Sequence, residues 1–445
     1  MSALGIIGLI AGIAVLIILA YRGVHLMVTG LLASLIVILT NGVDIWDTLV
    51  TGANAGTSFS MSMVGFIGSY FIMFAMGAIL GEFMSKSGYA KSIAVKLVDI
   101  FGTKNSILVV LLATVLIAYG GVSVFVIVFA VYPIGLYVFK QANMSKKIMP
   151  GVLMLGAGTF VMTALPGSPA LTNVVPTTYL GTSTWAAPVL GLILSVLMFV
   201  LGYAYLLWEG KRLQAKGEGF IAGPNDVVEE ITEETRKNLP NFFIAICPIV
   251  LIFVVQIIGT KFGLNATYAV SLGMLVATIF IAATAWGRVE NKLECINKGT
   301  NGSIGALINT ASIVGFGGVV KAVPAFSVFT SFALSLPFAP IISATLATAI
   351  IAGITTSSSG GLTMFMNMMA ESYLAQGINP EILHRLCAIA AGTLDSLPHA
   401  GPNVTMLMVM GLTYKDSYKY MFVITCIIPA IATVVGIMLA AMGIC

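Results

Sequence analysis

The most regular feature of this chain is a series of long apolar runs separated by short polar segments. A run of roughly 17–25 apolar residues can cross a bilayer as one helix. Eight uninterrupted runs predict membrane-spanning helices near residues 3–20, 23–40, 61–82, 188–208, 241–258, 266–286, 303–320 and 420–443. The first run lacks a cleavage pattern, so we interpret it as a retained helix rather than a signal peptide. Two further spans, 147–181 and 380–413, are each interrupted.

Composition agrees with this pattern. Of the 445 residues, 58% are hydrophobic and 9% are charged, and the mean hydropathy is +1.03. That is too little charge to cover a soluble protein of this size, so the predicted fold class is an all-α polytopic membrane protein. A net charge of +4 does not point to a nucleic-acid partner. Five cysteines without a CxxC pair indicate neither a disulfide nor a metal site, and we expect no cofactor.

The two halves of the chain echo each other. Residues 113–159 recur weakly as residues 347–393, at a constant offset of 234. Ala157-Gly158-Thr159, for example, recurs as Ala391-Gly392-Thr393. In each copy a glycine- or serine-rich break is followed, after one helix-length segment, by a proline-rich break. This order indicates an internal repeat.

Loops at matching places in the two copies differ in charge. Lys86, Lys91, Lys96 and Lys104 precede the first glycine-rich segment, whereas the matching stretch 320–338 has only Lys321. Short loops rich in lysine and arginine stay in the cytoplasm, so matching loops lie on opposite sides of the membrane. The sequence therefore predicts two inverted repeats, 1–208 and 241–445. The polar stretch 209–240, which joins them, has the charge pattern of a solvated cytoplasmic linker.

Residues 105–139 and 338–376 each begin and end on the same side under this topology. Each is either a pair of full crossings or a re-entrant hairpin, and the small residues at the tips favour the hairpin. Irregular backbone within a membrane is tolerated only where it is buried in protein or lines a wet cavity. The alternative is that these small residues serve helix packing. The predicted architecture therefore has about ten crossings, two re-entrant hairpins and two broken helices.

Each interrupted span contains a proline-rich break. The first break is Met162 to Pro169 and the second is Asp395 to Asn403. Two broken helices and two hairpin tips near the midplane are a common way to build a transporter's substrate site, because freed amides bind a carboxylate and freed carbonyls bind a cation. The candidate substrate-binding residues are Gly121, Ser123, Gly167, Ser168, Thr172, Asn173, Ser357, Ser358, Ser359, Gly360, Gly361 and Asn403.

Ionisable residues at this depth are few. Asp395 and His399 are the acid and the histidine of the second break, and the first break has neither type. A buried charge is costly and usually marks binding or proton relay, so we assign proton coupling to this pair. The alternative is that Asp395 caps a helix and His399 is a structural donor. We expect His25 and His384 to be interfacial beside Arg22 and Arg385, and we expect no arginine at the depth of the breaks.

These segments carry a family resemblance. The stretches YGGVSVFVIVFAVYP, LPGSPALTNVVPTTYLGT, TSSSGG and LDSLPHAGPNVTMLMVMGLT resemble the gluconate permease (GntP) family of the ion transporter superfamily. They look closest to its hydroxybutyrate or short-chain hydroxy-acid branch. The resemblance implies a homodimeric symporter of small monocarboxylates in the bacterial inner membrane. It also implies separate scaffold and transport regions, which is an elevator-type architecture. Sugar-acid members have a histidine in the first break, where this chain has Gly167-Ser168, which favours a smaller and less hydroxylated acid.

The leading hypothesis is uptake of a small organic monocarboxylate, such as 3-hydroxybutyrate, with protons. Sodium coupling, antiport and a gluconate-type substrate remain as alternatives. A channel would require a continuous polar or charged pore, and the chain lacks charged rings. An intramembrane enzyme would require a nucleophile and a base within reach, but Ser359 and His399 stand in no recognisable motif. We therefore predict a transporter and not an enzyme.

Overall fold

The structure is a computed structural model that describes residues 3–445 apart from 23, 55, 123, 224, 225, 227–231, 327–337, 356 and 399. The described residues form helices and no strand. The helices are α1 (Ala3–Tyr21), α2 (Leu26–Asn41), α3 (Phe59–Lys86), α4 (Tyr89–Phe101), α5 (Ser106–Tyr119), α6 (Val124–Gln141), α7 (Met149–Ala157), α8 (Phe160–Thr163), α9 (Leu171–Leu180), α10 (Pro188–Ala215), α11 (Glu233–Asn238), α12 (Phe242–Lys261), α13 (Ala266–Thr284), α14 (Lys292–Ala322), α16 (Pro340–Thr355), α17 (Ser358–Leu374), α18 (Pro380–Leu394), α19 (Gly401–Val409), α20 (Tyr414–Phe422) and α21 (Ile428–Ala441). Short π or 3₁₀ turns are η1 (Asp47–Thr51), η2 (Thr103–Asn105), η3 (Lys146–Ile148) and η4 (Val423–Ile427).

The eight predicted runs lie in α1, α2, α3, α10, α12, α13, α14 and the α20–α21 segment. Among the described residues, six helical segments are long and apolar enough to cross a membrane: α3, α10, α12, α13, α14 and Tyr414–Ala441. A seventh span results if α4 and the segment Thr103–Tyr119, which meet at a bend of 117°, are counted as one. Shorter apolar helical segments lie in α1, α2 and α16.

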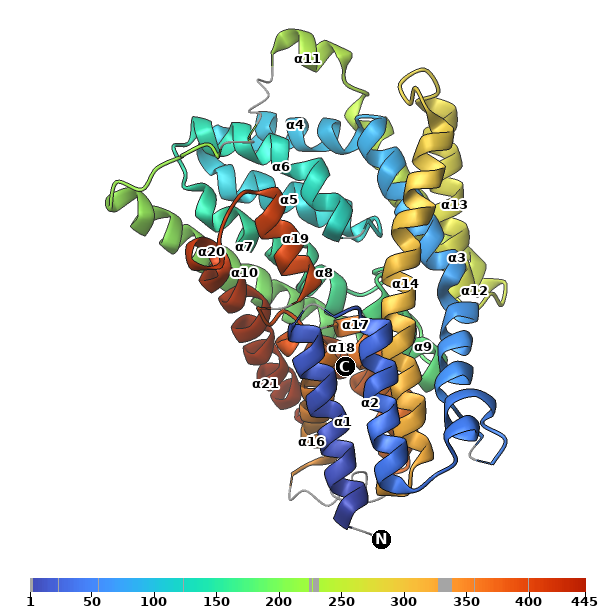
Figure 1. Ribbon diagram of the computed structural model, residues 1–445. Coiled ribbons are helices and arrows are strands. Elements are labelled where there is room, and N and C mark those ends of the chain that lie inside the picture. Colours follow the sequence, from blue (N-terminus) through green and yellow to red (C-terminus); the bar gives the residue numbers. More distant parts are fainter. Residues whose placement is uncertain are drawn as a thin grey trace.

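Long helices line one edge of the molecule. In Figure 1, α3, α12, α13 and α14 stand beside one another, and α1 pairs with α2 near the lower end of α14. Helices α10 and α21 pack together on the opposite edge. The shorter helices α5 to α9 and α16 to α19, which carry the predicted tips and breaks, lie between these edges. This arrangement places the candidate site residues in the middle of the molecule.

Close approach of α3 and α14 depends on glycine. A Cβ atom added at Gly299 would lie 2.7 Å from the Cα of Ile79, and one at Gly318 would lie 2.7 Å from the Ser58 carbonyl oxygen. Small residues let helix backbones approach in a membrane, where van der Waals packing and not hydrophobic exclusion drives association. The α3–α14 pair therefore forms a tightly packed layer behind the candidate site.

The two segments predicted as hairpins are helix pairs, α5–α6 and α16–α17. Their first arms pack in equivalent ways, α5 against α7 and α16 against α18. Two residues of the sequence echo also have matching contacts. The Thr114 hydroxyl donates to the Val110 carbonyl at 2.7 Å, and the Thr348 hydroxyl donates to the Ala344 carbonyl at 2.8 Å. The sequence echo therefore coincides with an echo in packing.

One helix was missed by the sequence analysis. The basic stretch between the third run and the first hairpin forms α4, which buries Ile93, Ala94, Leu97 and Val98 and exposes Lys96. Its apolar residues recur at the spacing of an amphipathic helix, a signal that the search for uninterrupted apolar runs passes over.

Candidate functional site

Both interrupted spans are broken helices. The first span consists of α7, α8 and α9, with the irregular segment 164–170 before α9. The second consists of α18 and α19, with the irregular segment 395–400 between them. Proline has no amide hydrogen to donate, so Pro166, Pro169 and Pro398 prevent a continuous helix from forming there. The positions of the breaks agree with those predicted from the sequence.

The side chain of Asn173 organises the first break. Its Nδ2 donates to the carbonyl oxygens of Ser168 at 2.7 Å and Thr184 at 2.9 Å, and the residue is fully buried. The Gly167 amide donates to the same Thr184 oxygen at 2.9 Å. Gly167 has a φ of +77°, a conformation that glycine adopts without steric cost. The loop after α9 therefore folds back onto the break and fixes its shape.

Arg385 and His384 complete this arrangement, and the expectation that they are interfacial was wrong. Both residues are fully buried. Arg385 Nη1 donates to Asn173 Oδ1 at 2.9 Å, and His384 Nε2 lies 3.2 Å from the same oxygen. Near the start of an apolar span both side chains could have reached water, but α18 turns them toward the first break. The sequence lacks a local signal for this contact because the partners lie over 200 positions apart.

The charge of Arg385 is stabilised by neutral oxygens. Its Nε and Nη2 donate to the Ala186 carbonyl at 3.1 and 2.7 Å, and Nη2 also lies 3.4 Å from the Thr184 carbonyl oxygen. Within the described part of the chain, no carboxylate lies within ion-pair distance of this guanidinium. Glu381, four residues earlier on α18, accepts the Ala187 amide at 3.1 Å and interacts with the Arg385 charge at longer range. A buried cation without a directly bonded counter-ion is costly and keeps a positive potential around it. An arginine is thus present at the depth of the breaks, contrary to the prediction.

Residues before and at the tip of α5–α6 contact the first break. The Tyr119 hydroxyl donates to the Pro166 carbonyl at 2.9 Å, and the Tyr119 ring stacks on Phe253. Gly121 has a φ of +82°, and a Cβ atom there would lie 3.1 Å from the Pro169 ring. Ser123, the other candidate at this tip, lies outside the described residues.

The other tip, at the start of α17, lies against both broken helices. Ser357 caps α17 by accepting the Gly360 amide at 3.1 Å. The Ser358 hydroxyl lies 4.0 Å from the Met162 sulfur and also interacts with the Asp395 carboxyl group. Ser359 lies beside Ser357, with 3.4 Å between the two hydroxyl oxygens. A Cβ atom at Gly361 would lie 2.4 Å from the Ala352 Cα, which explains this glycine by packing within the helix pair.

Two further candidates, Ser168 and Thr172, have partners inside the first break. Ser168 Oγ accepts the Ala170 amide at 3.3 Å, and the Thr172 hydroxyl donates to the Met162 carbonyl at 2.5 Å. Both residues are fully buried. These contacts hold the backbone of the break in place, whether or not the hydroxyls also reach a substrate.

The second break has the same kind of asparagine but different surroundings. Asn403 Nδ2 donates to the Ser396 carbonyl at 2.7 Å, whereas its Oδ1 is buried without a hydrogen-bond partner in the described part of the chain. Asp395 is 7% exposed and accepts the Ser396 hydroxyl at 2.9 Å. His399 lies outside the described residues. This break therefore presents a buried carboxyl group and an unpaired carbonyl oxygen.

The predicted linker is anchored to the protein around Asp226, which accepts from Lys146 Nζ and the Tyr132 hydroxyl, both at 2.6 Å. The Lys146 and Asp226 side chains are 5% and 4% exposed. Burial favours a raised pKa for Asp226, but the hydrogen bonds from Lys146, Tyr132 and the Gly223 amide outweigh it and lower the pKa. Tyr132 also lies 3.4 Å from the Met410 carbonyl oxygen. This part of the linker is thus held against the middle of α6, η3 and the end of α19, and is not simply solvated.

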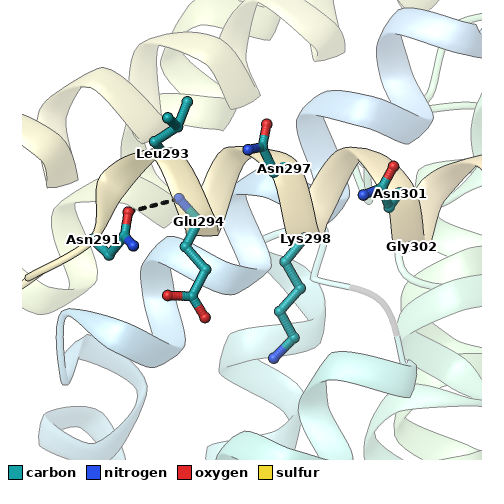
Figure 2. A pocket seen from close by; sticks show the side chains of 7 residues that line it. All are labelled: Asn291, Leu293, Glu294, Asn297, Lys298, Asn301 and Gly302. Carbon is teal, nitrogen blue, oxygen red and sulfur yellow. Dashed lines mark hydrogen bonds between the residues drawn. The ribbon is translucent and has the colours of Figure 1, made fainter.

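An open cavity of about 630 Å³ lies along the first half of α14, where Figure 2 shows the Asn297, Lys298 and Asn301 side chains leaving the helix. The other lining residues are Asn291, Leu293, Glu294 and Gly302. None of the candidate site residues lines this cavity. Its polar surface adjoins the Lys298–Glu82 ion pair, so we assign it to a membrane boundary and not to the site. In the described residues, no group of three or more His, Cys, Asp or Glu side chains is placed to bind a metal ion.

The fold matches that of a solved transporter. Aligned with the crystal structure of the Alcanivorax borkumensis YdaH transporter, which has an unusual topology, the chain gives a TM-score of 0.59 at 12% identity, covering 86% of this chain and 88% of that one. At such low identity the match shows the fold alone. Apolar helices, broken spans and this fold together define the class as a multi-pass helical membrane protein.

Sequence comparison gives the family. The model of the GntP family permeases matches residues 4–443, so the chain belongs to that family. A curated relative is an uncharacterized transporter, YxjC of Bacillus subtilis (strain 168), which is 36% identical over 407 residues covering 83% of this chain and 86% of the relative. The predictions of a GntP-type permease and of a transporter that is not an enzyme are confirmed.

Proposed function

We propose that this permease takes up a small organic monocarboxylate, such as 3-hydroxybutyrate, together with protons across the bacterial cytoplasmic membrane. The observation that carries the proposal is the buried Arg385, whose charge has only neutral hydrogen-bond partners among the described residues. This charge has no directly bonded counter-ion and only a longer-range interaction with Glu381, so it attracts an anion to the break in front of it. The first-turn amides of α17, which have no intrahelical acceptor, also favour a carboxylate.

The small size of the substrate follows from the polar groups at hand. Asn173, Ser168 and Thr172 already have hydrogen-bond partners within the protein, so few side chains remain for a polyhydroxylated chain. Backbone amides and the Ser357–Ser359 hydroxyls suffice for one carboxylate and one hydroxyl group. A gluconate-type sugar acid is the second candidate, and membership of the GntP family favours it.

We assign the coupling of transport to the proton gradient to the second break, where Asp395 and His399 carry the proton. Asp395 is buried beside Ser396 and Ser358, in contact with the tip that we assign to the substrate. A group that gains and loses a proton once per cycle in this position links substrate binding to the proton gradient. Sodium is the alternative coupling ion, because the unpaired Asn403 oxygen and the carbonyls of an unwound segment suit that cation. An antiport cycle would use the same groups.

The proposed architecture has two inverted repeats, residues 1–208 and 241–445, with about ten crossings and re-entrant hairpins at α5–α6 and α16–α17. The equivalent packing of α5 on α7 and of α16 on α18 supports it. We further propose a homodimer in the inner membrane, with elevator-type movement of the helices that carry the breaks. Inverted topology places the exposed residues Lys140 and Gln376 on opposite faces, so cysteines there should differ in labelling by an impermeant maleimide from outside. Equal labelling of both would overturn the topology.

The decisive functional test is uptake by purified protein in proteoliposomes. We expect an imposed proton gradient to drive accumulation of 3-hydroxybutyrate and other short hydroxy acids, with gluconate taken up poorly. A sodium gradient applied at equal pH on both sides separates the two coupling ions. Accumulation of gluconate in preference to all short acids would overturn the substrate assignment, and sodium-driven accumulation that ignores the proton gradient would overturn proton coupling.

A further inference from the structure

A charged cavity lies where α10, η3 and α20 meet, far from the two breaks along the chain. Its volume is about 160 Å³, and it is lined by Lys147, Glu209, Arg212, Leu213, Lys216, Glu218, Lys415, Asp416, Lys419 and Tyr420. The predicted topology places this cavity on the cytoplasmic side, since Lys216 and Glu218 begin the linker between the repeats. The cavity plays no part in the proposed transport mechanism.

Its acids are largely paired, whereas several of its cations have no carboxylate within ion-pair distance among the described residues. One of these cations, Lys419, lies with Nζ 4.6 Å from the centroid of the Tyr420 ring. Lys147 Nζ contacts Glu218 Oε2 at 2.6 Å, and Arg212 Nη1 contacts Glu209 Oε1 at 2.9 Å. Asp416 accepts the Thr413 amide at 3.0 Å in a helix-capping arrangement. The lining contains five basic and three acidic side chains, and Lys216, Lys415 and Lys419 are exposed. The net charge of the lining is therefore positive, which favours the binding of an anion.

Two buried polar atoms show that the cavity is built for a ligand with both accepting and donating groups. Glu209 Oε2 and the Tyr420 hydroxyl lack a hydrogen-bond partner among the described residues, although the two residues are 4% and 0% exposed. An unpaired buried polar group costs about 1–3 kcal/mol, so such groups usually have a partner. The tyrosine hydroxyl can donate to a phosphate oxygen, and the carboxylate oxygen requires a donor such as an alcohol hydroxyl.

The surroundings of the cavity indicate a lipid as the source of such a ligand. Helices α10 and α21 pack together, and α10 exposes Val196, Val200 and Trp208 while α21 exposes Val434 and Met438. Apolar side chains exposed at this depth contact acyl chains. Trp208 stands one turn before the cavity, with Arg212 5.4 Å above its ring, and tryptophan is enriched at the membrane–water boundary. Basic pockets between membrane helices on the cytoplasmic side are known to bind anionic headgroups.

We propose that this cavity binds the headgroup of an anionic glycerophospholipid that carries free hydroxyls, as phosphatidylglycerol does. The phosphate lies among Lys216, Lys415 and Lys419 and accepts from Tyr420, and a glycerol hydroxyl donates to Glu209. The acyl chains follow the exposed apolar side chains of α10 and α21. Lys147 precedes α7, and α20 follows α19, so the headgroup fastens the cytoplasmic ends of both broken helices to α10.

The test measures thermal unfolding of the full chain in phosphatidylcholine-containing micelles, with phosphatidylglycerol added. This readout does not depend on substrate or coupling ion, so it is separate from the proposed function. We expect phosphatidylglycerol to raise the unfolding temperature of the wild type. The triple variant Lys216→Gln, Lys415→Gln, Lys419→Gln should bind it roughly tenfold more weakly or worse, because each basic residue near an anionic surface contributes measurably.

The matched control removes the same charge elsewhere on the predicted cytoplasmic side, with Lys96→Gln, Lys104→Gln and Lys140→Gln, and should keep the wild-type response. Glu209→Gln should reduce the preference for phosphatidylglycerol over phosphatidic acid, which lacks the glycerol hydroxyls, and Tyr420→Phe should weaken binding of both. Equal losses in the two triple variants would show non-specific surface charge and overturn the site. A full response to soluble glycerol phosphate would overturn a lipid source.

Discussion

The two breaks use the same local device in different electrostatic surroundings. In each, an asparagine near the start of the following helix donates to a carbonyl of the break, from Asn173 to Ser168 and from Asn403 to Ser396. The carboxamide oxygen of Asn173 then accepts from Arg385 and His384. That of Asn403 has no such partner in the described part of the chain, and the acid Asp395 lies in the same break.

This difference gives the two breaks of the repeated fold different electrostatic properties. A permanent cation fixes the first break, so its backbone is rigid and its potential is positive at every stage of a cycle. The second break has an acid and an unpaired oxygen and lacks a resident arginine at the matching place, Gly151 being the repeat counterpart of Arg385 at the same offset. We infer that the first break suits the anion and the second suits the exchangeable cation.

The largest effect is expected for Arg385→Gln, which removes the cation from the first break. The Ala186 carbonyl loses both of its Arg385 donors, and a buried acceptor left unsatisfied costs about 1–3 kcal/mol. We expect little folded protein, measured as the monodisperse fraction after extraction in detergent. Arg385→Lys keeps the positive charge but lacks the planar guanidinium group, so it should recover only part of the yield of folded protein. Arg22→Gln, at an exposed site, is the control and should have no effect. A normal yield of Arg385→Gln would contradict the role of Arg385 in holding the first break.

Gly360→Val tests the α17 tip that lies between the breaks. A Cβ atom there would be 3.1 Å from Ser357 Oγ and would disturb the helix cap. We expect normal insertion but loss of both net uptake and exchange, because the anion site itself is blocked. Gly65→Val, on α3 with open space around it, serves as the control. Unchanged substrate affinity in Gly360→Val would count strongly against the proposed site.

Asp395→Asn tests the second break. It keeps the shape of the side chain and removes its ability to gain and lose a proton. We expect normal insertion, loss of accumulation driven by a pH gradient, and retained exchange of preloaded substrate. His399→Gln should behave in the same way. Proton-driven accumulation with an unchanged pH profile in both variants would return these residues to a structural role. The contrast with Gly360→Val, which loses exchange as well, separates coupling from substrate binding.

The smallest effect is expected for Asp226→Asn in the linker, where this residue contacts α6 and η3. The lowered pKa of Asp226 means that its contribution to stability is present above its unfolded value of about 3.9 and is lost as pH falls below it. The Gly223 amide donates to this carboxylate at 2.6 Å, so its protection from exchange, relative to the intrinsic rate at the same pH, should fall below roughly pH 4 in the wild type. In Asp226→Asn the exchange should be fast at neutral pH also. Slow exchange in the variant at pH 7 would show that the linker is held elsewhere.

The sequence by itself determined the class of the protein and the places where its helices break. Apolar runs long enough for a bilayer, and prolines such as Pro166 and Pro398 that cannot donate a backbone hydrogen bond, act locally and are visible in any chain. The helix α4 was missed because its amphipathic pattern is shorter and more charged than a membrane span. Its residue spacing nevertheless contained the signal.

Only the tertiary structure decided which residues surround the breaks. His384 and Arg385 look like boundary residues from their neighbours in sequence, yet they lie buried against Asn173 because α18 packs on α9. Asp226 looks solvated within a charged linker, yet it pairs with Lys146 and Tyr132. Burial and pairing of a charge depend on groups brought together from distant positions, and hydrophobic periodicity reports only which face of one helix avoids water.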